Sequence, residues 1–321
     1  MKKTNLLFMT TMITGTLITL MSNNWLSMWM GLEMNLMSFI PLINMKPSKS
    51  SPEASLTYFM VQSMSSILML SILMLIMMEA PSNMLIYILT MSLLIKLGMA
   101  PFHIWMPKIM ATLSWNMNIL MMTWQKIAPL YMINLLEFNH IMYTSALLSV
   151  TLGALMGIYQ NSMRKIMAYS SISHMGWLLT LNKIKNSWIM YMLIYSTMIV
   201  TLCYYLSTKK VLFISQMMEI KTSLIQKISF TVMMMSLGGL PPLTGFLLKI
   251  MVIEEMMATQ SMWMMTVMII TSMLTLFFYM RITLKMIMMQ SISTKWIMTK
   301  NKFNLMMLII NIALPLMIIS Y

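Results

Sequence analysis

Long apolar runs separated by short polar segments fill almost the whole chain. A helix needs about 20 apolar residues to cross the hydrocarbon core of a bilayer, and eleven runs approach this length. They cover residues 4–22, 25–43, 57–78, 84–104, 115–136, 143–160, 166–182, 188–206, 228–256, 262–282 and 303–320. No Gly/Ser-rich linker or low-complexity tail divides the chain. The pattern therefore predicts one all-α polytopic membrane domain over residues 1–321, with about eleven transmembrane helices and no large soluble part.

The composition supports this prediction and excludes several kinds of site. The chain is 59% hydrophobic and only 9% charged, whereas a soluble domain carries about a quarter charged residues. The single cysteine, Cys203, excludes an internal disulfide and a cysteine-ligated cluster within the chain. The three histidines are widely scattered, which argues against a histidine metal site or haem ligation. We therefore expect no metal or cofactor in this chain.

Basic residues give the predicted helices an orientation. With eleven spans, sixteen of the 21 Lys and Arg residues fall on the N-terminal side of the membrane and two fall on the other side. Positively charged loops stay in the inside compartment. We therefore expect the N-terminus inside and, because the span number is odd, the C-terminus outside. The net charge of +14 is explained by these loops and needs no nucleic-acid partner.

Four ionisable residues lie within the predicted spans, namely Glu33, Lys96, Lys126 and Lys249. A lysine near the centre of a transmembrane helix is unfavourable by about 2.5–3.5 kcal/mol, so four charges together call for a compensating role. One interpretation is an ion pair between Glu33 and a lysine that only holds helices together. The other is a polar axis at mid-depth that carries ions or protons. A buried lysine suits the second role because a nearby carboxylate can switch it between holding and releasing a proton.

Helix-breaking residues accompany two of these lysines. Gly98 and Pro101 follow Lys96, and a second group precedes Lys249. The second group consists of Gly238, Gly239, Pro241 and Pro242. A break inside lipid is tolerated only where neighbours or water satisfy the backbone, so each break indicates a hydrated cavity; a simple packing kink is the alternative for the second.

The two broken helices lie five spans apart. Matching breaks in two halves are a pointer to a transporter site between repeats, and an odd separation inverts the topology of one unit relative to the other. We expect repeat units at about 4–136 and 143–282, with a final helix at 303–320.

Two histidines are weaker candidates. His103 follows the first break, and His174 lies in the stretch SSISHMGW beside serines. Either could relay protons, since histidine titrates near neutral pH. Ordinary burial with interhelical hydrogen bonds explains each of them about as well.

The chain contains 53 methionines. They are spread along every span rather than clustered in loops, which favours apolar packing over soft metal binding. Asn, Lys, Ile and Tyr are plentiful in the chain, and Ala, Gly and Arg are scarce. This composition is typical of an A+T-rich mitochondrial genome in which an extra codon is read as Met.

Six stretches in order carry a family resemblance: WMGLEMNLMSFIP, EASLTYFMVQS, KLGMAPFHIWMP, LMMTWQKIAPL, MRKIMAYSSISHMGW and LGGLPPLTGFLLKI. Together they resemble the mitochondrially encoded subunit 2 family of NADH dehydrogenase, the antiporter-like membrane subunits of respiratory complex I (NADH:ubiquinone oxidoreductase). The resemblance covers residues 1 to about 285. More remotely, the stretches are similar to subunits of cation/proton antiporters.

This resemblance implies eleven helices in two inverted five-helix units. It implies proton translocation through Glu33, Lys96, Lys126 and Lys249, driven by electron transfer elsewhere. NADH, FMN, iron–sulfur clusters and ubiquinone would be bound by other subunits, and none by this chain. The expected location is the mitochondrial inner membrane, with the N-terminus in the matrix and the C-terminus in the intermembrane space. Partners would be the other membrane and peripheral subunits, lipids including cardiolipin, water and protons, but no nucleic acid.

Two other functions stay open at this point. A stand-alone cation/proton antiporter would have the same architecture. A purely structural membrane subunit would carry the same charges without using them.

Overall fold

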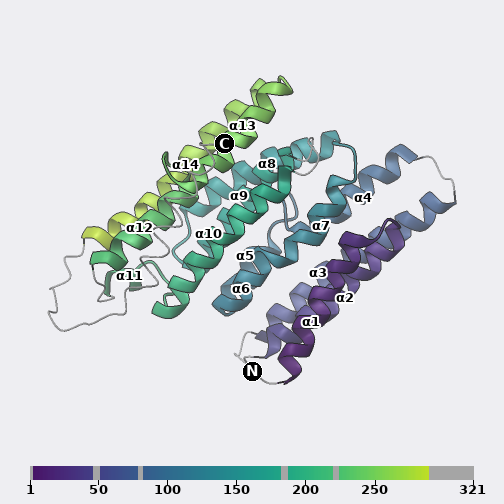
Figure 1. Cartoon of the computed structure of the whole chain (residues 1–321), viewed down its shortest axis with the longest axis horizontal. Coiled ribbons are helices and arrows are strands. Elements are labelled where there is room, and N and C mark those ends of the chain that lie inside the picture. Colours follow the sequence, from purple (N-terminus) through teal and green to yellow (C-terminus); the bar gives the residue numbers. More distant parts are fainter. Residues whose placement is uncertain (1–2, 46–50, 79–81, 182–186, 220–223, 289–321) are drawn as a thin grey trace. The chain divides into compact units, whose positions relative to one another are not determined.

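The computed structural model describes residues 3–45, 51–78, 82–181, 187–219 and 224–288, and these residues form an all-α protein (Figure 1). Within those ranges the extended backbone is limited to one isolated bridge between Ser162 and Phe213. Helices predominate because each one satisfies its backbone hydrogen bonds internally, which a segment surrounded by lipid must do. The all-α membrane fold predicted from the apolar runs is confirmed.

The helices divide between two compact units, the first ending at Ser149 and the second beginning at Val150. The first contains α1 (Lys3–Met21), α2 (Trp25–Asn44), α3 (Ser51–Met77), α4 (Ser82–Leu97), α5 (Trp105–Thr112), α6 (Trp115–Met122) and α7 (Trp124–Asn134). The second contains α9 (Met163–Thr180), α10 (Ser187–Lys209), α11 (Gln216–Glu219), α12 (Leu224–Gly238), α13 (Thr244–Ala258) and α14 (Met262–Met288). The boundary falls within α8 (His140–Ile158).

In the first unit, α1, α2 and α3 lie side by side, as Figure 1 shows in purple and blue, and α4 packs against α3. Glycines allow the closest of these contacts. A Cβ atom on Gly31 would lie 2.7 Å from the carbonyl oxygen of Gly15 and 2.5 Å from Cγ2 of Thr19. Small residues at a helix crossing let two backbones approach closely, which is how membrane helices gain packing energy without a hydrophobic driving force.

In the second unit, α9 forms the interior. Its side chains from Ser170 to Thr180 are all buried, and it contacts α10 and α13. The helix α12 packs against α10, α13 and α14. A helix buried around its whole circumference belongs to a protein core rather than to the lipid boundary.

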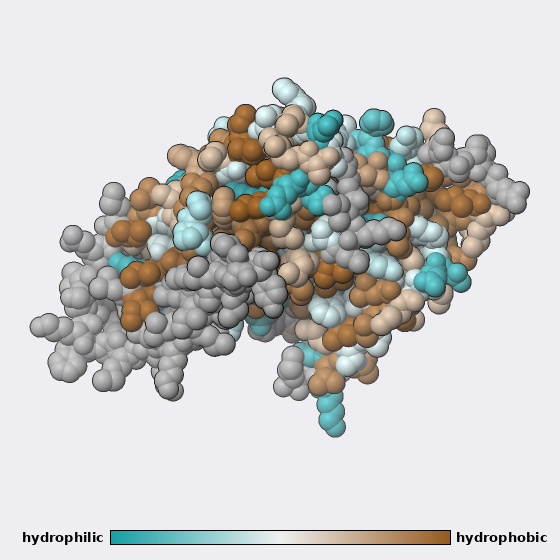
Figure 2. Space-filling model, turned by 45° about the horizontal axis from the view of Figure 1, so that its top comes forward, coloured by the Kyte–Doolittle hydropathy of each residue, from teal (hydrophilic) through white to brown (hydrophobic). Residues whose placement is uncertain are grey.

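The outer helices carry apolar side chains on their exposed faces. Among the described residues six helices are long and apolar enough to cross a membrane, namely α1, α2, α3, α8, α10 and α14. Large side chains such as Met64 and Ile270 are each 65% exposed, and Figure 2 shows apolar side chains over much of the face in view. Exposed apolar surface of this extent suits contact with lipid. The chain is therefore a multi-pass membrane protein.

Three predicted spans differ from single helices. The span predicted at 84–104 is helix only to Leu97 and continues after a break as α5, and the span at 228–256 is divided into α12 and α13. The prediction of one continuous helix over 115–136 is wrong, because α6 and α7 are separated at Thr123. The Thr123 hydroxyl donates to the carbonyl of Ile119 at 2.8 Å, a bond of the type that bends helices. Pro129, the sixth residue of α7, also has no N–H to donate to the carbonyl of Gln125.

The final predicted helix, 303–320, lies outside the described residues, so the total of eleven spans stays a prediction. The division into repeats at 4–136 and 143–282 likewise stays a prediction.

Candidate functional site

The first broken helix ends in a defined hydrogen-bonded cap. Gly98 has φ +68°, the left-handed conformation that glycine adopts without strain. The N–H of Gly98 donates to the carbonyl of Ile95, and the N–H of Met99 donates to that of Leu94, both at 3.1 Å. This pair of bonds is the Schellman arrangement that closes a helix. It places Lys96 in the last turn of α4, where the partial negative charge of the helix end favours a cation.

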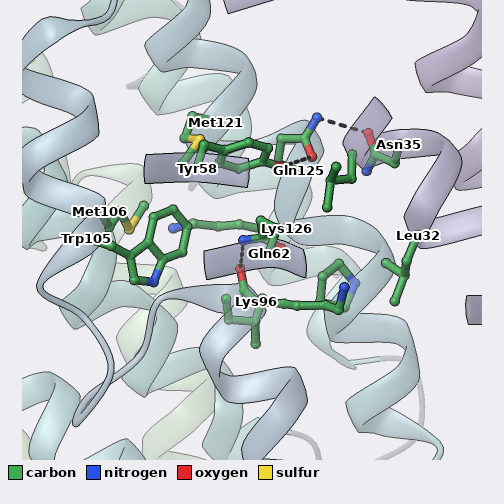
Figure 3. A pocket seen from close by; sticks show the side chains of 13 residues that line it. Leu32, Asn35, Tyr58, Gln62, Lys96, Trp105, Met106, Met121, Gln125 and Lys126 are labelled. Carbon is green, nitrogen blue, oxygen red and sulfur yellow. Dashed lines mark hydrogen bonds between the residues drawn. The ribbon is translucent and has the colours of Figure 1, made fainter. Parts of the chain in front are cut away.

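Lys96 and Lys126 line the same cavity inside the first unit, together with apolar side chains such as Trp105 and Met106 (Figure 3). The polar side chains of the lining are those of Asn35, Tyr58, Gln62, Lys96, Gln125 and Lys126. Both lysines are almost fully buried, with 7% and 3% of their surface exposed. The space holds about one or two water molecules. Two amines and a few polar groups around so small a volume can exchange a proton through water.

Two glutamines organise the walls of this cavity. Gln62 on α3 donates through Nε2 to the backbone carbonyl of Lys96 at 3.2 Å. Gln125 on α7 donates to Oδ1 of Asn35 at 3.0 Å and accepts from the hydroxyl of Tyr58 at 3.2 Å, as the dashed lines in Figure 3 show. These four polar residues are not among the site residues predicted from the sequence. Their isolation within apolar runs was the available signal, because a buried polar side chain must find a partner.

Lys126 occupies the opposite kind of helix end from Lys96. It is the third residue of α7, just after the break at Thr123. The partial positive charge of a helix N-terminus disfavours a cation. The two lysines of the cavity therefore lie in unlike electrostatic surroundings, although both are buried.

Glu33 lies beside the cavity rather than in its wall. The neighbouring residues Leu32 and Asn35 line the space, but Glu33 does not. Its Oε1 is buried and has no hydrogen-bond partner among the described residues. A direct ion pair with Glu33, the contact required by a purely mechanical clamp, is not formed in the part of the chain that the structure describes.

The second unit has a break with the same local geometry. Gly239 has φ +70°, its N–H donates to the carbonyl of Ser236 at 2.9 Å, and the N–H of Leu240 donates to that of Met235 at 3.3 Å. Here the lysine comes from the far side of the break. Lys249 on α13 donates through Nζ to the carbonyl of Gly238, the last residue of α12, at 2.5 Å. Both units thus hold a lysine at the C-terminal end of a broken helix.

The two histidines lie away from the cavity lining. His174 is buried in α9, with Nδ1 2.9 Å from the hydroxyl of Tyr191 and its ring centroid 5.0 Å from that of Tyr195. His103 lies between α4 and α5, with Nδ1 3.3 Å from the carbonyl of Pro101. His174 therefore belongs to a polar cluster of the second unit and His103 to the first break. A relay role for either remains a prediction.

Comparison with known proteins places the chain among membrane subunits of respiratory enzymes and antiporters. Residues 22–275 match the family described as NADH:quinone oxidoreductase/Mrp antiporter, TM. The NADH-ubiquinone oxidoreductase chain 2 of Anopheles gambiae is 38% identical over 314 residues, covering 95% of this chain and 92% of that protein. The protein of the same name from Peropteryx kappleri is 39% identical over 297 residues, covering 87% and 84%.

Solved structures show the same fold at low sequence identity. A chain of respiratory complex I from Thermus thermophilus with bound aureothin superimposes with a TM-score of 0.87 at 20% identity, covering 98% of this chain and 78% of that one. A chain of the Mrp complex from a Dietzia species gives a TM-score of 0.74 at 17% identity, covering 85% and 58%.

Proposed function

Because this chain belongs to the NADH:quinone oxidoreductase/Mrp antiporter transmembrane family, and within it to the NADH-ubiquinone oxidoreductase chain 2 proteins, we propose that it moves protons across the membrane as a subunit of such an oxidoreductase. The observation that supports this most directly is the pair Lys96 and Lys126 on one water-sized cavity inside an apolar helix bundle. A lysine near the centre of a transmembrane helix is unfavourable by about 2.5–3.5 kcal/mol, so two of them on one cavity support a functional role.

In the proposed mechanism a proton arrives at Lys96, crosses the cavity through water and reaches Lys126. The C-terminal end of α4 favours the charged form of Lys96, whereas the N-terminal end of α7 disfavours the charged form of Lys126. Transfer of the proton from Lys96 to Lys126 is therefore uphill in free energy. Glu33 controls the step in this proposal, because it lies between Leu32 and Asn35, which line the cavity that holds Lys96. A change in the protonation or position of that carboxylate would alter how tightly Lys96 holds its proton. Lys249 is the last proposed carrier before release.

The remaining assignments follow the same proposal. NADH, FMN, iron–sulfur clusters and ubiquinone are bound by other subunits, and electron transfer there drives the pump. The chain lies in the mitochondrial inner membrane among the other membrane and peripheral subunits, with cardiolipin among its lipids. The bias of basic residues supports an N-terminus in the matrix and a C-terminus in the intermembrane space.

A cation/proton antiporter is the second candidate, favoured by the fold shared with a chain of the Mrp complex. The two functions separate in a native gel of mildly solubilised membranes that is stained for NADH oxidation, with this chain located by mass spectrometry. Its presence in a large NADH-oxidising band supports the pump. Its presence only as a small species without that activity supports the antiporter, and cation-dependent proton exchange in vesicles then tests it.

Replacement of the cavity lysines tests the pump itself. We expect Lys96→Met and Lys126→Met to lower proton pumping by the assembled complex at least about tenfold, because methionine fills a similar volume without holding a proton. Coupled NADH oxidation should fall with it. Lys108→Met is the matched control, since this lysine lies exposed on α5 outside the cavity. Unchanged pumping by the two cavity variants, in a complex assembled to the normal amount, would refute the proposal and favour a structural role.

A further inference from the structure

The end of α4 leaves one backbone carbonyl that the main chain does not satisfy. The two bonds of the cap use the carbonyls of Leu94 and Ile95, so the next one along is that of Lys96. The amide that would reach it in helical register is Ala100, which makes no such bond. A buried carbonyl without a donor is unfavourable, and in lipid no bulk water supplies one. The side chain of Gln62 supplies it instead.

The second unit has a different arrangement at its break, where the cap uses the carbonyls of Met235 and Ser236 and the side-chain donor reaches Gly238, the position that corresponds to Leu97 in the first unit. There the carbonyl of Gly238 accepts a hydrogen bond from the ammonium group of Lys249. The lysine of that unit is thus tied to the backbone by a charge-assisted hydrogen bond, a stronger bond than one between neutral groups. In the first unit the neutral amide of Gln62 occupies the carbonyl, and no hydrogen bond or ion pair holds the ammonium of Lys96 among the described residues.

Gln62 also lies where it can act on the proton step. It is 7% exposed, on α3, and its side chain lines the same cavity as Lys96 and Lys126 (Figure 3). If this amide were absent, the carbonyl of Lys96 would compete for the one or two waters of the cavity or for a lysine ammonium. Either outcome would interrupt transfer between the two lysines.

We propose that Gln62 is a positioning residue for proton transfer, which caps the broken helix at the Lys96 carbonyl and so leaves the Lys96 ammonium available to the cavity. This inference rests on the proposed function, because it assigns Gln62 a role in the same proton step. It adds a residue outside the charged axis, one whose contribution is a hydrogen bond to the backbone rather than a proton.

The test uses Gln62→Met in the assembled complex, because methionine keeps the length and volume of glutamine and removes the donor. We expect proton pumping per assembled complex to fall about tenfold, because groups displaced at the cavity lose the geometry that proton transfer needs, and coupled NADH oxidation to fall with it. Gln62→His, which restores an N–H donor, should recover at least half of the loss. Ser71→Ala is the control, because it removes an exposed hydrogen-bonding group from the same helix.

A merely structural role predicts a different result. Gln62→Met would then lower the amount of assembled complex, while each assembled complex would pump at the normal rate, and this would overturn the inference. Lys96→Met, measured in parallel, separates the two proposals. Normal pumping by Gln62→Met with loss in Lys96→Met refutes the inference alone, whereas normal pumping by Lys96→Met refutes the proposed function. If Gln62→Met does not assemble, Gln62→Asn moves the amide one methylene away from the carbonyl and carries the same expectation.

Discussion

The position of Lys249 at the second helix break can be tested by a substitution of Gly239, which lies next to the lysine side chain. A Cβ atom on Gly239 would lie 2.5 Å from Cε of Lys249 and 2.8 Å from both Cδ and Nζ. Gly239→Ala therefore displaces the side chain from the carbonyl of Gly238. It also places a Cβ at φ +70°, which is unfavourable by about 1–2 kcal/mol for a residue other than glycine.

The two effects have different sizes and different consequences. Loss of the lysine donor leaves a buried carbonyl unsatisfied, at about 1–3 kcal/mol. Alanine also lowers the conformational entropy of the unfolded chain, which offsets about 0.4–1 kcal/mol of the destabilisation. We expect Gly239→Ala to be destabilising by about 1–5 kcal/mol in total, and to lower proton pumping per assembled complex, because Lys249 no longer occupies its site.

Two matched glycines separate these effects. Gly98→Ala introduces the same left-handed strain, since its φ is +68°, but its Cβ would meet the ring of Trp105 at 3.0 Å rather than a lysine. Gly238→Ala adds a methyl group beside Gly239 that would make ordinary van der Waals contacts, with its nearest neighbours at 3.6 Å. Pumping should be measured in vesicles and stability by thermal loss of the assembled complex. Equal pumping by Gly239→Ala and Gly238→Ala would refute the reasoning, because only the first displaces the lysine.

Two further predictions concern stability. Arg281 donates to the carbonyls of Ile158 and Gln160, around the end of α8, at 2.5 and 2.8 Å. Arg281→Leu should therefore lower the stability of the folded chain by about 1–2 kcal/mol in a thermal unfolding measurement. Lys285→Leu on the same helix is the control, and equal stability of the two variants would contradict this prediction. Gly31→Ala should be destabilising by about 1–3 kcal/mol because its Cβ would lie 2.5 Å from Cγ2 of Thr19, and adding Thr19→Ser, which removes that methyl group, should recover part of the loss. No recovery would show that another contact is responsible.

Much of the fold follows from patterns that the chain carries locally. The positions of α1, α2, α3, α8, α10 and α14 follow from apolar runs long enough to cross a bilayer. The ends of α4 and α12 lie directly before glycines in the left-handed conformation. Both features are readable because they depend on residues close together in sequence, namely on hydrophobic length and on backbone conformations that glycine adopts most readily.

The break at Thr123 could not be predicted in the same way. Threonine and proline occur within membrane helices without breaking them, since neighbouring helices satisfy the freed backbone groups. Whether such a residue bends, breaks or merely interrupts hydrogen bonding depends on those neighbours. For the same reason Gln62 and Gln125 carried only a weak signal, because their partners lie on other helices.

Residues close together in the chain are enough to identify a polytopic helical membrane protein, to associate Lys96 and Lys249 with helix breaks, and to indicate the family that the chain resembles. These conclusions rest on hydrophobicity, charge and local conformation, all of which act over short stretches. The folded molecule was needed to show that Lys96 and Lys126 share one cavity while Glu33 lies beside it, and that Gln62 bonds to the first break while Lys249 bonds to the second. Those contacts join helices far apart in sequence, and the packing of the helices sets which polar groups meet.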